Sequence, residues 1–113
     1  KENIMPTVSL FISPAENQPG NYLVVVNGEG FYQSANKSVG ARIRGEDPWF
    51  DDRLFSIGGT GLERVGQDGR FTLSAIVSGS QLNEDWGQDE IYALVSVAGL
   101  SGSYRSNTVK GNF

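Results

Sequence analysis

Apolar and polar residues alternate with a period of two along several short segments of the chain. The clearest segment runs from Arg70 to Val77, and Thr7–Ile12 and Ile91–Ala98 follow the same pattern. A period of two is typical of a β-strand that buries one face. The polar face of the first segment also carries the aromatic Phe11. Less regular apolar runs predict further strands over Tyr22–Asn27, Ser38–Arg44, Leu54–Ile57, Leu62–Val65 and Tyr104–Phe113.

Turn signals separate these segments. Glycine accounts for 15 of the 113 residues, and tight-turn dipeptides occur at Asp68-Gly69 and Ser101-Gly102. No stretch shows a convincing helical period, so Ser78–Glu90 is interpreted as a polar loop. Seven to nine short antiparallel strands, spaced by roughly ten residues, are typical of an Ig-like β-sandwich. We expect this all-β sandwich to occupy residues 1–113 as one domain.

The alternation also assigns side chains to the two faces of each strand. In the strand predicted over residues 38–44, the apolar positions face inward and leave Arg42 and Arg44 outward. Phe31 follows a glycine-rich break and is predicted to turn inward as a lid over one end of the sandwich. Tyr92 lies on the opposite face from its apolar neighbours, yet its size and position favour a place in the core.

Composition narrows the chemistry available to such a domain. The chain contains no histidine and no cysteine, so the commonest general base, the commonest metal ligand and thiolate chemistry are all missing. We therefore expect a protein that is not an enzyme. The net charge is −4, and the basic residues are scattered, which argues against nucleic acid and anionic membranes as partners. No apolar run reaches the length of a membrane span, so membrane insertion is not expected.

Several short motifs resemble those of the neocarzinostatin and macromomycin apoproteins, which are secreted Ig-like carriers of enediyne chromophores. The resemblance implies a secreted carrier of a small ligand, with Trp49 as the counterpart of one cleft residue. That family carries two disulfides, which this cysteine-free chain lacks. The first third, with its Gly28-Glu29-Gly30-Phe31 motif, also resembles IPT/TIG domains. The residues that carry the apoprotein resemblance are Pro6-Thr7-Val8-Ser9-Leu10, Pro14, Gly20, Val24, Val26, Gly28, Gly30, Phe31, Val39-Gly40, Trp49, Asp68 to Leu73, Trp86-Gly87 and Val109 to Phe113.

Two loops combine acidic side chains with aromatic ones. Glu46–Asp52 contains Trp49 and Phe50, and Asn83–Glu90 contains Trp86. The aromatic rings could form a stacking platform for a sugar or an aromatic ligand, and the carboxylates could accept hydrogen bonds or bind Ca²⁺. Alternatively, the rings cap the end of the core and the acids are solvated. A shared site requires both loops to lie at the same end of the sandwich.

These observations predict a non-enzymatic binding module that is secreted or displayed at the cell surface. Its expected partner is a small molecule, a glycan or a protein surface. The alternative is a structural or spacer module of a larger cell-surface protein that mediates protein–protein contact. No cofactor is expected, although Ca²⁺ at the acidic loops stays open. The candidate ligand-binding residues are Trp49, Phe50, Asp51, Asp52, Trp86 and Tyr104, the last of which fits a core position equally well.

Overall fold

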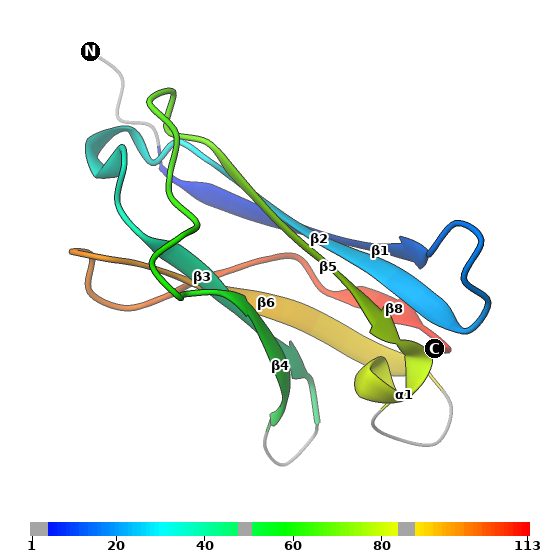
Figure 1. The fold of residues 1–113 in the computed structure, drawn as a ribbon. Coiled ribbons are helices and arrows are strands. Elements are labelled where there is room, and N and C mark those ends of the chain that lie inside the picture. The colour runs from blue at the N-terminus through cyan, green and yellow to red at the C-terminus, as the bar shows by residue number, and fades with distance from the viewer. Residues whose placement is uncertain (1–4, 48–50, 84–87) are drawn as a thin grey trace.

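Two antiparallel β-sheets pack face to face in the computed structural model, which describes residues 5–47, 51–83 and 88–113 (Figure 1). One sheet has the strand order β1-β2-β5. The other has the order β4-β3-β6, and both β7 and β8 pair with β6. This arrangement confirms the predicted all-β sandwich. The strands are β1 (Thr7–Pro14), β2 (Asn21–Glu29), β3 (Val39–Gly45), β4 (Asp52–Gly58), β5 (Phe71–Ser78), β6 (Asp89–Val97), β7 (Tyr104–Arg105) and β8 (Val109–Gly111).

The core lies between the sheets and is built from every second residue of the long strands. Its β-branched and leucine side chains suit a pleated surface that is buried on one side. Phe31 is buried as predicted, and its ring packs against the rings of Phe71 and Tyr104, with centroids 5.4 and 5.1 Å away. Residues at most 1% exposed in this core include Leu10, Val24, Val26, Val39, Ile43, Ile91 and Val95.

Two predicted elements differ from the structure. The loop expected over residues 78–90 contains a short helix, α1 (Gly79–Leu82). Its first turn is capped by the side chain of Gln81, which accepts a hydrogen bond from the backbone N–H of Ser78 (3.0 Å), and Leu82 anchors it in the core. The strand expected over residues 62–65 forms only an isolated bridge, between Ser38 and Arg64. A further one-turn 3-10 helix, η1, spans Tyr32–Ser34.

The last predicted strand is also interrupted: β7 and β8 both pair with β6 in the five-stranded sheet, but the side chains of the residues between them bond to the backbone of both sheets. The side chain of Ser106 accepts a hydrogen bond from the backbone N–H of Ala93 (2.8 Å). The neighbouring Asn107 amide accepts from the N–H of Leu10 (2.8 Å) and donates to its carbonyl (3.1 Å). Asn107 therefore pairs with the edge of β1 as another strand would, and it links the two sheets.

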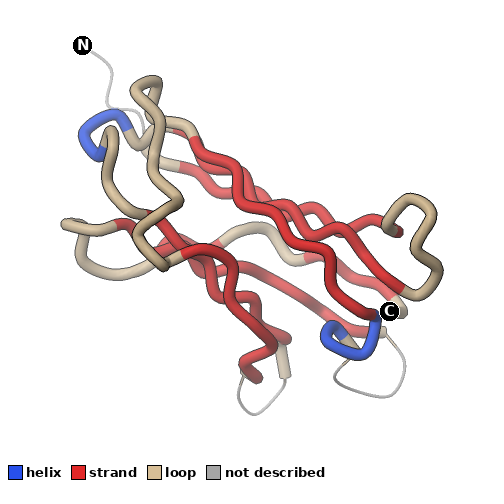
Figure 2. The backbone as a smooth tube through the Cα atoms, in the orientation of Figure 1, coloured by secondary structure: helices blue, strands red, loops and turns tan. Residues whose placement is uncertain are grey.

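The two ends of the described chain emerge at opposite ends of the sandwich (Figure 2). Thr7 begins β1 opposite Glu29, whereas Gly111 ends β8 opposite Asp89 beside α1. Among the described residues, no helix has the length and apolar character needed to cross a bilayer.

Candidate functional site

The two acidic loops leave the five-stranded sheet at the same end. Gly45, the last residue of β3, pairs with Ile91 near the start of β6, and the N–H of Glu46 donates to the carbonyl of Glu90 (2.7 Å). The described ends of the loops therefore lie side by side, as a shared site requires. Trp49, Phe50 and Trp86 lie outside the described residues, so an aromatic platform on these loops stays a prediction.

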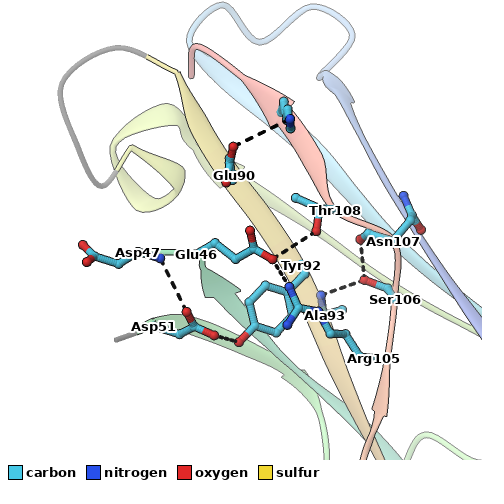
Figure 3. A network of polar contacts seen from close by, with 11 residues as sticks. Glu46, Asp47, Asp51, Glu90, Tyr92, Ala93, Arg105, Ser106, Asn107 and Thr108 are labelled. Carbon is cyan, nitrogen blue, oxygen red and sulfur yellow. Dashed lines mark hydrogen bonds and ion pairs between the residues drawn. The ribbon is translucent and has the colours of Figure 1, made fainter. Parts of the chain in front are cut away.

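A network of charged and polar side chains occupies this end of the sheet (Figure 3). The hydroxyl of Tyr92 donates a hydrogen bond to the carboxylate of Asp51. The guanidinium of Arg105 lies over the Tyr92 ring, 3.8 Å from its centroid, and forms an ion pair with Glu46. Glu46 also accepts a hydrogen bond from the hydroxyl of Thr108 (3.4 Å). The network thus ties the β3–β4 loop to β6, β7 and the segment before β8.

Tyr92 is only 2% exposed, but it lies on the outer face of the sheet rather than in the core between the sheets. Its register partner Arg44 also lies on that face, and Arg105 covers its ring. Burial, then the hydrogen bond to Asp51 and the negative charge of that carboxylate, raise the pKa of Tyr92 to about 12, against the opposing effect of Arg44 and Arg42. The environment therefore favours the neutral, hydrogen-bond-donating phenol.

The carboxylates around this network surround an open depression of about 290 Å³, lined by Glu46, Asp47, Asp51, Glu90 and Arg105. Glu46 pairs with Arg105, Asp51 accepts from Tyr92, and Glu90 lies 3.8 Å from the ammonium of Lys110. The backbone N–H of Asp47 donates to the carboxylate of Asp51 (3.4 Å). Within the described ranges, no group of three or more acidic side chains is arranged to hold a metal ion. Calcium binding by these loops stays a prediction.

The remaining candidate residues lie in different places. Asp52 begins β4 opposite Gly45 and is half-buried. Tyr104 pairs with Val95, which is six positions along β6 from Asp89, and its ring packs against Phe31 between the sheets. The structure therefore brings Asp51 and Asp52 to the acidic end but places Tyr104 in the core packing, away from the loops.

A second surface, which the sequence analysis did not single out, lies on the outer face of the three-stranded sheet. There Phe11 is 55% exposed and borders an open depression of about 350 Å³. The hydroxyl of Thr72 donates to the side-chain oxygen of Asn27 across the strands (2.7 Å). The sequence signal for this surface is Phe11 itself, an aromatic residue at a position where the strand pattern places polar residues. Large apolar side chains are usually buried, so an exposed ring on a sheet suggests a binding surface. The polar side chains that line the depression are Thr7, Ser9, Asn27, Glu29, Arg70 and Thr72.

A comparison of the chain with family models, with curated proteins and with solved structures finds no match. The resemblance to the enediyne apoproteins and to IPT/TIG domains therefore stays a prediction, and the function is argued from the surfaces of the molecule itself.

Proposed function

We propose that this chain is a non-enzymatic, secreted or cell-surface module that binds glycans. The observation that carries the proposal is the exposed ring of Phe11 beside a depression rich in hydrogen-bonding side chains. Pyranose rings present an apolar C–H face and a rim of hydroxyl groups. An aromatic ring next to amide, hydroxyl and charged side chains complements both features.

The depression supplies several groups that suit sugar hydroxyls. Because the side-chain oxygen of Asn27 already accepts from Thr72, the amide nitrogen of Asn27 is left as a donor. Glu29 and Arg70 line the same depression from β2 and from the turn before β5, and they add an acceptor and a planar set of donors. Since Asn27, Glu29 and Thr72 stand on strands rather than on long loops, their backbone positions are fixed before a ligand arrives, which lowers the cost of binding.

The proposal is tested by affinity electrophoresis in gels that contain neutral polysaccharides, followed by titration with the best ligand. Replacing Phe11 with Thr removes the ring and keeps a residue that suits a strand. Because burying a phenylalanine side chain is worth about 1.5–3 kcal/mol, the substitution should weaken binding roughly ten- to a hundredfold. Leu62→Thr is the matched control, since Leu62 is an 85% exposed apolar residue outside the depression. Equal retardation of both variants and the wild type would refute the proposal.

A spacer role in a larger cell-surface protein is the second candidate. The positions of the two ends of the described chain favour it, because modules that enter and leave at opposite ends can be joined head to tail without reversing the chain (Figure 2). The sequence on either side of these residues in the full gene tests this role. The spacer role would be favoured if the gene encodes repeated sandwich modules or a surface anchor there and if no polysaccharide retards the protein in the gel.

The loop aromatics provide a separate test of the carrier role implied by the enediyne apoprotein resemblance. Trp49 and Trp86 are the only tryptophans in the chain, so intrinsic fluorescence reports on these two loops alone. Red-shifted emission that acrylamide readily quenches would support an accessible aromatic site there. Blue-shifted emission that resists quenching would mean that both indoles cap the core, and the loops would be dropped as a ligand site.

A further inference from the structure

The outer face of the five-stranded sheet gathers positive charge on an otherwise acidic protein. Arg42 and Arg44 project outward from β3, and Arg53 and Arg105 come from β4 and β7. Register places Arg42 opposite Ser56 on one side and Leu94 on the other, and Leu94 is in turn opposite Arg105. Four of the nine basic residues of the chain therefore share one face, although the net charge is −4.

Most of this charge has no acidic partner within the described ranges. The ion pairs there join Arg105 to Glu46 and Lys110 to Glu90, at the loop end of the sheet. Arg44 and Arg53 lie directly opposite each other on adjacent strands, which is an unfavourable arrangement for like charges. An anionic group bound over this face would relieve that repulsion and would meet exposed guanidinium groups.

A groove of about 510 Å³ runs along the same face next to Arg42. The floor of the groove is low because Gly40, the outward-facing residue of β3 next to Arg42, has no side chain. Gly40 lies opposite Gly58 on β4 and opposite Ser96 on β6. A Cβ on Gly40 would lie 2.7 Å from backbone atoms of Gly59, so only glycine keeps this floor.

The walls of the groove offer hydroxyl groups. Ser38, Ser56 and Ser96 line it, and the guanidinium of Arg42 donates to the hydroxyl of Ser103 (2.9 Å), which holds Arg42 at its border. Serine hydroxyls both donate and accept hydrogen bonds, as sugar hydroxyls do. A ligand that carries both negative charges and hydroxyl groups therefore matches both features of this face, the guanidinium groups and the hydroxyl-lined groove.

We propose that the arginine face of the five-stranded sheet, formed by Arg42, Arg53 and the serine-lined groove beside Arg42, binds an anionic polysaccharide. The anionic group is a carboxylate or a sulfate on the sugar. This site is independent of the Phe11 surface, which lies on the other sheet.

The test is retardation and titration at low salt with polygalacturonate, which is carboxylated, and with dextran sulfate, with neutral dextran as the uncharged control. Both acidic polymers carry anionic groups on a sugar backbone. The polymer that binds more tightly identifies the anionic group as a carboxylate or a sulfate. Removing Arg42 and Arg53 together as R42Q/R53Q should weaken binding by about tenfold per arginine. The slope of log Kd against log salt should fall by roughly one for each charge removed.

The matched control is K37Q/R64Q, which removes the same charge from exposed residues that do not line the groove. Thermal melts of each variant confirm that it is folded before binding is compared. Three results would overturn the proposal: no binding of either acidic polymer by the wild type, equal weakening by the control, or binding of poly-L-glutamate as tight as that of the acidic polysaccharides. The Phe11 surface is tested separately with neutral polysaccharides, so either proposal can be refuted without affecting the other.

Discussion

Tyr92→Phe tests whether the hydrogen bond to Asp51 stabilises the loop end of the sandwich. The substitution keeps the ring under Arg105 and removes only the hydroxyl that donates to Asp51. A hydrogen bond to a charged group is worth about 1.5–3 kcal/mol. The rise of the Tyr92 pKa from 10.0 to about 12 corresponds to about 2.7 kcal/mol in total; burial is its largest cause, so the hydrogen bond to Asp51 accounts for only part of that figure.

We therefore expect Tyr92→Phe to lose about 2 kcal/mol of unfolding free energy at neutral pH, which is roughly 8 °C in Tm for a domain of this size. Urea titrations with far-UV circular dichroism measure the loss. Tyr32→Phe is the control, because it removes a tyrosine hydroxyl from a side chain that is 57% exposed.

The pH dependence gives the same prediction a second check. Since the folded protein holds the Tyr92 proton more tightly than the unfolded chain does, this contribution to stability is complete below pH 10 and is lost as pH rises from 10 to about 12. The wild type should lose its advantage over Tyr92→Phe across that window. An unfolding free energy for Tyr92→Phe within about 0.5 kcal/mol of the wild type at neutral pH, or a constant difference through the alkaline window, would refute the reasoning.

Two further substitutions test the packing between and within the sheets. Asn107→Ala should cost about 2–4 kcal/mol, because it leaves the N–H and carbonyl of Leu10 without their partner on the edge of β1, and faster exchange of the Leu10 amide hydrogen would show the cause. An unchanged Leu10 exchange rate would contradict this role. Gly28→Ala should destabilise by at least about 2 kcal/mol, since its Cβ would lie 2.1 Å from the ring of Phe71 and that ring is packed in the core. A melt equal to that of the wild type would show that Phe71 moves freely, against the packing described.

The alternation of residue types along the chain determined most of the strands and the inward face of each. Segments such as Thr7–Ile12 and Arg70–Val77 are recognised from sequence because a strand with one buried face must place apolar residues at every second position. The same rule placed Arg42 and Arg44 outward. It also placed Phe11 on a polar face, where its ring lies exposed.

Tertiary structure decided where these segments meet. The helix at Gly79–Leu82 depends on the burial of Leu82 and on one cap, which is too short a pattern for a helical period to show. The last predicted strand breaks because Asn107 bonds to Leu10, a residue 97 positions earlier in the chain. No local pattern contains that pairing.

The same limit applies to the candidate sites. Asp51 and Tyr92 are 41 residues apart in sequence, and only the pairing of β3 with both β4 and β6 brings them together. Likewise, Arg42 and Arg105 share a face only because β3 and β7 both flank β6. A period of two tells which side of a strand a residue occupies. Which strands become neighbours is decided by the packing of the whole chain into two sheets, and that choice sets which side chains can bind together.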